Sequence, residues 1–405
     1  MSEVSPVVEK SSMGRWFVPA LFICFFAATG DGPILRLFSA SMAKDFNVQV
    51  GFVLQLSTVN NIAEVIIALL VAFLAVRFSH KSLLLVGIGL VAVSTVGNFL
   101  APTLGLTLFF FAMEGIGSVI VGIIGLTLIG ELLPLNKRGK AVGNMIAAGS
   151  ASAIIGTFAL GLIANVAGWR STFILFVLPL AVVGLFLAFL ILPSQSHEKP
   201  LSIGGRAYLA SFKQVFLNKS AASCLLGGFL MSTTGLAIFA TPYFIQKFLI
   251  SPWMVIVFNA IAALVVVAAS IVTGQLINRF GRKNLTVVGA LVGSILAMPI
   301  FFIPNLWIGA AINMAHVWFI WTGITAFSSY VLEQAPKARG TMMSMRNIFS
   351  GLGAALGAAL GGALLVLLSF DLALSYQTVG LTLGAIGIAG SAVFYFLTKD
   401  PYSAR

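Results

Sequence analysis

Charge is scarce in this chain of 405 residues: charged residues make up 8% of it, whereas hydrophobic residues make up 59%. A typical soluble globular domain contains about 25% charged residues. So few charges cannot solvate the surface of a soluble protein of this length, which excludes that class. The composition instead predicts a protein that resides in a lipid bilayer.

The chain is also poor in residues that perform covalent or metal chemistry. Its two cysteines, Cys24 and Cys224, fall in separate hydrophobic stretches, which excludes a disulfide framework and a CxxC motif. The three histidines have no acidic or cysteine partners at metal-ligand spacing. The sequence has no glycine-rich phosphate-binding loop ending in lysine. We therefore expect no enzymatic activity, no metal, no cofactor and no direct use of ATP.

Long hydrophobic stretches are what the chain does contain. Twelve of them approach or exceed the roughly 20 residues that cross about 30 Å of hydrocarbon as a helix. They lie near 16–41, 50–76, 82–101, 106–133, 141–167, 171–193, 220–245, 252–277, 285–303, 307–332, 342–368 and 375–397. Backbone groups in lipid must be satisfied internally, and runs without alternating polarity achieve this as helices. The prediction is an all-α integral membrane protein with twelve transmembrane helices.

The sequence repeats itself at an interval of 202 residues. Segment 72–81 lies over segment 274–283, and Glu131 lies over Glu333. Many secondary transporters consist of two homologous halves that rock about a site between them. We expect six-helix bundles at 1–193 and 220–405, related by a pseudo-two-fold axis and joined by a cytoplasmic linker at 194–219.

Basic residues predict the orientation of the chain. With both termini in the cytoplasm, all but four of the 23 lysines and arginines fall on the cytoplasmic side or in its loops. The four exceptions are Arg36, Lys44, Arg170 and Lys247. The net charge of +12 is therefore explained by membrane topology, and nucleic-acid binding has no support. We expect a multi-pass protein of the cell membrane, monomeric, with lipid as its surroundings.

Several motifs resemble those of one transporter family. The loop from Gly274 to Lys283 resembles the signature loop of the major facilitator superfamily, with Asn278 where that family usually has aspartate. The segments Gly168-Trp169-Arg170-Ser171-Thr172-Phe173 and Thr241-Pro242-Tyr243 resemble its drug and sugar efflux branches. The resemblance implies alternating access, with the first, fourth, seventh and tenth spans lining a central cavity.

Two departures from that pattern concern proton coupling. Proton-coupled antiporters of the superfamily usually carry an arginine in the fourth span, where this chain has Phe111. Their fifth span usually carries a Gly-Pro pair, where this chain has Gly156-Thr157. Both differences favour the alternative of a facilitator or an uptake symporter.

Three acidic residues lie within the hydrophobic stretches: Asp31, Glu64 and Glu114. A charge at that depth costs on the order of 3 kcal/mol unless it meets a partner, a cavity or a proton. We expect substrate or proton binding by all three. The alternatives are backbone repair at the Asp31-Gly32-Pro33 triplet and an interhelical hydrogen bond from Glu64, which follows Asn60 and Asn61.

Further candidates for the substrate site are polar or aromatic residues of the same spans. Arg36 either contacts the substrate or extends to the outer surface. His316 lies 202 residues after Glu114, so the repeat places it at the equivalent position, where a packing role is the alternative. The remaining cavity candidates are Thr233, Tyr243, Asn259, Asn313 and Trp321.

Charged and glycine residues of the cytoplasmic loops are candidates for a conformational latch. Salt bridges and helix-end contacts among them would hold the outward-facing state, and the alternative is a role in topology alone. They are Arg77, Lys81, Glu131, Arg138, Gly274, Arg279, Gly281, Arg282, Glu333, Arg339 and Arg346.

Together these features predict a secondary transporter of a small, partly hydrophobic organic solute. We expect alternating access and proton-coupled efflux. A facilitator or uptake symporter for a sugar or metabolite is the first alternative. A membrane receptor or a lipid scramblase on the same scaffold is the second.

Overall fold

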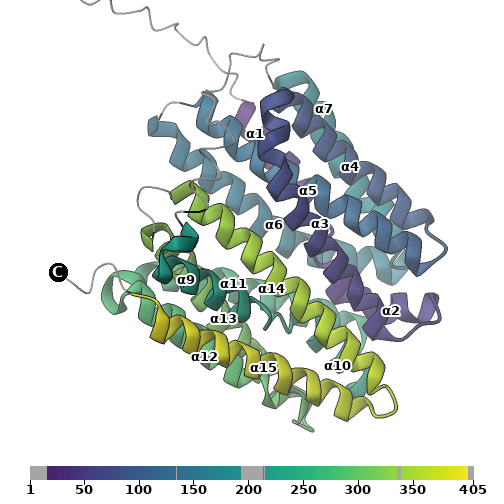
Figure 1. Cartoon of the computed structure of the whole chain (residues 1–405). Coiled ribbons are helices and arrows are strands. Elements are labelled where there is room, and N and C mark those ends of the chain that lie inside the picture. The colour runs from purple at the N-terminus through teal and green to yellow at the C-terminus, as the bar shows by residue number, and fades with distance from the viewer. Residues whose placement is uncertain (1–15, 134, 193–212, 214, 335–338, 400–405) are drawn as a thin grey trace, which may run out of the picture.

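The computed structural model of the chain describes residues 16–133, 135–192, 213, 215–334 and 339–399 (Figure 1). These residues form helices and connecting turns, with no β-strand among them. Eleven stretches of helix are long and apolar enough to cross a membrane, and Phe17–Ala28 is a shorter apolar helix. The all-α membrane class predicted from composition is confirmed at this level.

The helices of the first part of the chain are α1 (Phe17–Ala28), α2 (Ile34–Asp45), α3 (Val50–Arg77), α4 (His80–Leu100), α5 (Leu104–Leu132), α6 (Leu135–Ala167), the π-helix η1 (Phe173–Val177) and α7 (Leu178–Ile191). Those of the second part are α9 (Lys219–Ser232), α10 (Ala237–Phe248), α11 (Pro252–Phe280), α12 (Arg282–Ala297), the short 3₁₀ helix η2 (Pro299–Phe301), α13 (Leu306–Gln334), α14 (Arg339–Leu367) and α15 (Leu372–Leu397). We call α1–α7 the first helix set and α9–α15 the second. The expected linker at 194–219 lies mostly outside the described residues.

Two of the expected spans, 16–41 and 220–245, are each formed by two helices with a break between them, and the second pair lies within one apolar stretch, Lys219–Phe248. The first is interrupted between α1 and α2 at Asp31-Gly32-Pro33, where Pro33 supplies no N–H and precedes the first residue of α2. The second is interrupted between α9 and α10, around Gly235. The two breaks fall about 202 residues apart, so they repeat with the sequence.

Each set packs mainly within itself, and a few helices join the two. Within the first set α4 and α3 pack on α5, and α1 packs on α7; within the second α12 packs on α13 and α9 packs on α15. The sets meet along α3 and α14, α6 and α11, and α2 and α10. Figure 1 shows α14 beside α3 near the middle of the molecule.

One end of the molecule is closed between the two sets. We call it the distal end; it carries the turns 46–49, 249–251 and 368–371, opposite the end to which the described termini belong. There Gln49 donates a hydrogen bond of 3.0 Å to Ser369. Gly51 of α3 faces Gly362 of α14 so closely that a methyl group on Gly51 would meet the Gly362 carbonyl. Glycine at these two positions lets the backbones touch.

Apolar packing follows the same division. One buried cluster contains residues of both sets, among them Phe38, Leu54 and Leu160 with Phe239 and Leu365. The other two clusters each belong to one set, the first to residues 17–192 and the second to residues 215–394. Packing between the sets is therefore concentrated toward the distal end.

Replacing Gly51 with alanine is expected to open the distal end. The added methyl group would also lie 2.9 Å from the Val366 side chain, and such overpacking costs about 1–3 kcal/mol. That cost corresponds to a roughly ten-fold change in the population of the closed form. Ser375 lines a distal cavity of about 330 Å³. A Ser375→Cys reporter should then react roughly ten-fold faster with a membrane-impermeant maleimide.

The matched control is Gly105→Ala, because a methyl group at Gly105 meets nothing within 4 Å. The native Cys24 and Cys224 are both buried, so the background labelling is low. Equal labelling rates for the Gly51 and Gly105 variants would contradict the closure described above.

Candidate substrate and proton site

The helix break after α1 brings an acidic residue to the centre of the molecule. Asp31 lies in the break, Glu64 lies on α3 and Glu114 lies on α5, and all three line one cavity of about 270 Å³. Asp31 and Glu114 are buried, while Glu64 is half-buried. Three carboxyl groups that are 33 to 83 residues apart in the sequence therefore face the same space.

Hydrogen bonds connect Glu114 and its helix to α3. The Asn60 amide donates to Glu114 Oε2 at 2.6 Å and to the Phe111 carbonyl oxygen at 3.0 Å. The Asp31 and Glu114 carboxyl groups are neighbours in the same cavity. Two neighbouring carboxyl groups can share a hydrogen bond only when one of them carries a proton and donates it. This arrangement can therefore hold one proton between two acids.

Asp31 also contacts the backbone at the helix break. Its carbonyl oxygen accepts a hydrogen bond from the Ile34 N–H at 2.7 Å. Asp31 therefore contributes a backbone hydrogen bond at the break and a side chain to the acidic cavity.

A second, more apolar cavity adjoins the acids. It has a volume of about 400 Å³ and shares Thr29, Glu64 and Ser118 with the acidic cavity. Its other walls come mainly from apolar side chains, including Phe25 and Met145. The two cavities together could hold a solute with a polar group near the acids and an apolar body beside it.

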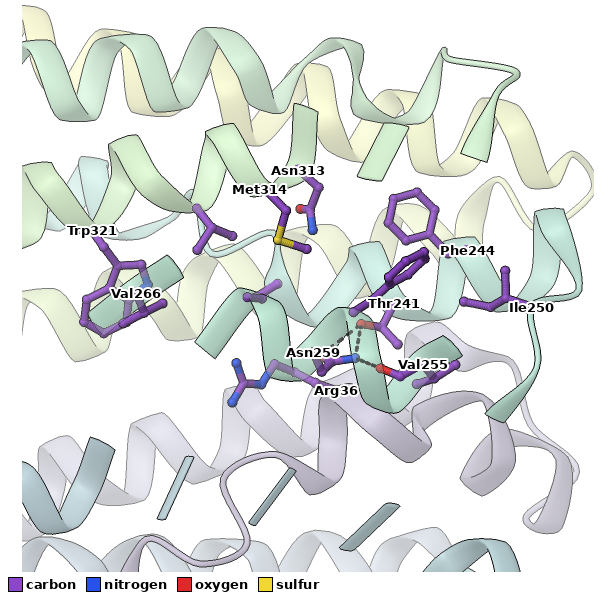
Figure 2. Close-up of a pocket in the computed structure, with 14 residues that line it drawn as sticks. Arg36, Thr241, Phe244, Ile250, Val255, Asn259, Val266, Asn313, Met314 and Trp321 are labelled. Carbon is purple, nitrogen blue, oxygen red and sulfur yellow. Dashed lines mark hydrogen bonds between the residues drawn. The ribbon is translucent and has the colours of Figure 1, made fainter. Parts of the chain in front are cut away.

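Arg36 of α2 lines both the acidic cavity and a third, smaller one, and Figure 2 shows the smaller one. This third cavity is about 50 Å³ in volume and lies between α2, α10, α11 and α13. Three of the predicted cavity residues line it: Asn259, Asn313 and Trp321. Sequence reasoning missed Thr241, whose hydroxyl lies 3.2 Å from the Asn259 amide nitrogen. Thr241 lies about one turn after the break between α9 and α10, and this position was the signal that could have identified it.

Three other predicted residues line none of the four cavities named above. Thr233 donates to the Leu230 carbonyl at 2.8 Å, within its own helix. Tyr243 donates to the Phe301 carbonyl at 2.8 Å. His316 is buried, with Nδ1 2.8 Å from the Gly293 carbonyl oxygen on α12. These contacts are structural in kind, and for His316 they correspond to the packing alternative.

The predicted latch residues form equivalent contacts in the two sets at the end opposite the distal one. His80 Nδ1 lies 2.9 Å from Glu131 Oε2, between α4 and α5. Arg282 forms an ion pair with Glu333, between α12 and α13. His80 and Arg282 are 202 residues apart, as are the two glutamates, so the repeat extends to a side-chain contact.

Two lysines repeat in the same way. Lys81 Nζ donates to the Leu192 and Phe189 carbonyls, both at 2.7 Å, near the end of α7. Lys283 Nζ donates to the Thr398 carbonyl at 2.6 Å, just past the end of α15. Each lysine satisfies carbonyls that a helix leaves unpaired at its C-terminus.

The remaining latch candidates lie at helix ends, within α11 or on α14. Gly281 has φ +79°, a backbone conformation that favours glycine, and separates α11 from α12. Arg346 donates to Ser328 at 2.9 Å, and Arg279 lies over the Phe280 ring. Arg77 ends α3, Gly274 lies within α11, and the side chains of Arg138 and Arg339 lie outside the described residues. The ion pairs join helices of one set, so they do not link the two sets in this structure.

A comparison with protein families identifies the chain at the level of family. The model of the Major Facilitator Superfamily matches residues 20–332, most of the chain. The chain belongs to the major facilitator superfamily. Membership agrees with the apolar membrane-spanning helices described above, and the relatives found are named as transporters.

Relatives of known sequence within the superfamily are distant. The riboflavin transporter RibZ of Clostridioides difficile is 25% identical over 50% of this chain and 45% of its own length. The uncharacterized transporter Rv1250 of Mycobacterium tuberculosis is 25% identical over 44% of this chain and 31% of its own length. YbcL of Bacillus subtilis, also uncharacterized, is 22% identical over 57% of this chain and 58% of its own. The alignments thus span less than two thirds of each relative.

Solved structures resemble the fold over nearly the whole chain. A D-xylose-proton symporter superposes with a TM-score of 0.81 at 15% identity, covering 96% of this chain and 99% of its own. An inward-facing bacterial homologue of the human lysosomal transporter Spinster gives 0.78 at 15% identity, covering 97% and 98%. Identities this low establish the fold alone.

The repeated ion pairs predict unequal effects of two matched substitutions. Arg282 is always charged, whereas His80 is charged only when protonated. Glu333 is also the less exposed partner, at 13% against 40% for Glu131. Glu333→Gln should therefore slow transport by roughly five-fold, as expected for about 1 kcal/mol. Glu131→Gln should change transport less, and equal rates of uptake into vesicles would contradict this account.

His316→Leu is expected to affect stability rather than transport. The Gly293 carbonyl can only accept, so the histidine Nδ1 donates, and its loss removes one donor to this carbonyl. Such a loss costs about 1–3 kcal/mol, and the melting temperature of the purified protein should fall. The transport rate per folded molecule should stay within about two-fold of the parent. Substitutions away from a critical site usually change free energies by about 0.5 kcal/mol or less. Loss of transport at unchanged stability would instead assign His316 to the substrate site.

Proposed function

We propose that this protein is a proton-coupled secondary transporter that exports a small, partly hydrophobic organic solute across the cell membrane. The observation that carries the proposal is the cavity where Asp31, Glu64, Glu114 and Arg36 meet. Ionisable side chains at membrane depth commonly mark substrate paths and proton relays. The adjoining cavity of about 400 Å³ supplies the apolar surface for the solute.

The architecture we propose has twelve spans. The pairs α1–α2 and α9–α10 each count as one broken span, because discontinuous helices commonly form the binding sites of transporters. Bundles at 1–193 and 220–405 would then be related by a pseudo-two-fold axis, with 194–219 as the cytoplasmic linker. The repeated helix breaks and repeated ion pairs support this, and the basic residues support cytoplasmic termini. The protein would act as a monomer.

Coupling would arise from a proton shared between the neighbouring carboxyl groups of Asp31 and Glu114. Without a proton the two carboxylates repel each other in a low-dielectric cavity, and with one proton they attract. Proton loss would therefore separate α5 from the break after α1, next to the solute. Alternating access would make this change available to one side of the membrane at a time.

A facilitator or uptake symporter is the second candidate. Phe111 stands where proton-coupled antiporters of the superfamily usually carry arginine, and here it offers only its carbonyl to Asn60. The D-xylose-proton symporter shares the fold, which permits uptake as a direction.

Asp31→Asn and Glu114→Gln are expected to abolish the response of transport to a pH gradient. Each change removes one of the two neighbouring acids that would share the proton, so the site would no longer bind and release it. Exchange between equal pools of substrate should continue, because it needs no net proton movement. The measurement is substrate flux in proteoliposomes with an imposed gradient, acid inside or acid outside.

Glu64→Gln separates the possible roles of the third acid. A severe loss of coupling would mean that Glu64 relays the proton, while a mild one would mean that it only shapes the cavity. The direction of gradient-driven flux distinguishes efflux from uptake. Flux in the unmodified protein that ignores the gradient would refute coupling and favour the facilitator.

A further inference from the structure

Arg36 is a charged side chain at membrane depth with no hydrogen-bond or ion-pair partner among the residues that the structure describes. No hydrogen bond or ion pair joins its guanidinium to any described residue, including the nearby Asp31, Glu64 and Glu114. An arginine at that depth is costly without an anion beside it. Its guanidinium presents five donors in a planar fork that fits a carboxylate. The missing partner is therefore expected to be an anionic ligand.

The small cavity on the far side of Arg36 has a second group without a partner. Asn313 is 8% exposed, and its Oδ1 is buried without a hydrogen-bond partner. Figure 2 shows the Asn313 side chain directed into this cavity, on the side facing Arg36. A buried acceptor without a donor costs about 1–3 kcal/mol, which a ligand hydroxyl or N–H would recover.

The other polar groups of the cavity are already engaged. The Asn259 amide nitrogen contacts the Val255 carbonyl at 2.9 Å and the Thr241 hydroxyl at 3.2 Å (Figure 2). Asn259 is thus held in place and does not neutralise Arg36. Phe244, Phe258 and Trp321 supply apolar walls.

We propose that this cavity is an anion subsite, in which Arg36 binds a carboxylate of the transported solute and Asn313 accepts a hydrogen bond from a hydroxyl or N–H next to it. The volume of about 50 Å³ fits one such polar group, and the apolar body extends toward the larger cavities. The substrate class is a hydroxylated organic monocarboxylate. Transport of the bound solute rests on the function proposed above, whereas its binding at the subsite does not.

Binding can be tested without any gradient, by thermal stabilisation of the full-length purified protein. The probes are mandelate and a panel of aryl and alkyl hydroxymonocarboxylates, with mandelamide as the neutral analogue and phenylacetate as the analogue without a hydroxyl. Loss of a charge-assisted contact is worth about 1.5–3 kcal/mol, so mandelamide should bind roughly ten- to a hundred-fold more weakly. Phenylacetate should bind roughly five-fold more weakly, for one neutral hydrogen bond.

Variants assign the effect to the cavity. Arg36→Gln should remove the preference for mandelate over mandelamide, and Arg36→Lys should retain part of it because lysine keeps the charge and loses the fork. Asn313→Leu should remove the preference for mandelate over phenylacetate. Lys247→Gln, which removes an exposed positive charge at the end of α10, is the control and should change neither.

Two results would overturn the proposal. One is that no carboxylate in the panel stabilises the protein; the other is that Arg36→Gln leaves the preference for carboxylate over amide intact. A failure of proton coupling in proteoliposomes would leave these binding results unchanged. The two proposals can therefore fail separately.

Discussion

The nearness of two buried carboxyl groups, those of Asp31 and Glu114, in one cavity is the constraint on which the central region depends. Two such groups can share a hydrogen bond only if one of them carries a proton, and their nearness requires α5 to lie against the end of α1. Gly115 makes the approach of α3 possible, because a side chain there would meet the Asn60 amide. Asn60 then holds Glu114 from the other side at 2.6 Å. The break after α1, the glycine at position 115 and the pair of acids therefore depend on one another.

The two helix sets share a plan but divide the polar chemistry unequally. The acids come from the first set, whereas Thr241, Asn259 and Asn313 come from the second. Arg36 stands on α2 at the junction of the two. A solute that touches both sets senses their relative position, which is what a transporter requires of its binding site.

Sequence reasoning was most successful where the hydrocarbon makes polar residues conspicuous. Asp31, Glu64 and Glu114 were identified because acids are costly in hydrophobic helices, and the structure places all three at one cavity. The helix break near Gly235 was missed because a single glycine is a weak signal.

His316 shows the limit of the repeat as a predictor. The repeat gives the position of its backbone but not the partner of its side chain. That partner is the Gly293 carbonyl on a neighbouring helix, which lies close because glycines line α12. Thr241 was missed for a related reason. Threonines in helices often bond their own backbone, so only the nearness of Asn259 distinguishes this one.

The closure of the distal end has a consequence for how the surroundings act on the protein. The contact of Gly51 with Gly362 and the apolar cluster around Phe38 and Phe239 involve no formal charge. Screening by salt weakens interactions between exposed charges and leaves such packing almost unaffected. The opposite end, with its His80–Glu131 and Arg282–Glu333 pairs, is built from charges. Ionic strength would therefore act on the two ends unequally, so that salt on one side of the membrane influences the molecule and salt on the other hardly does.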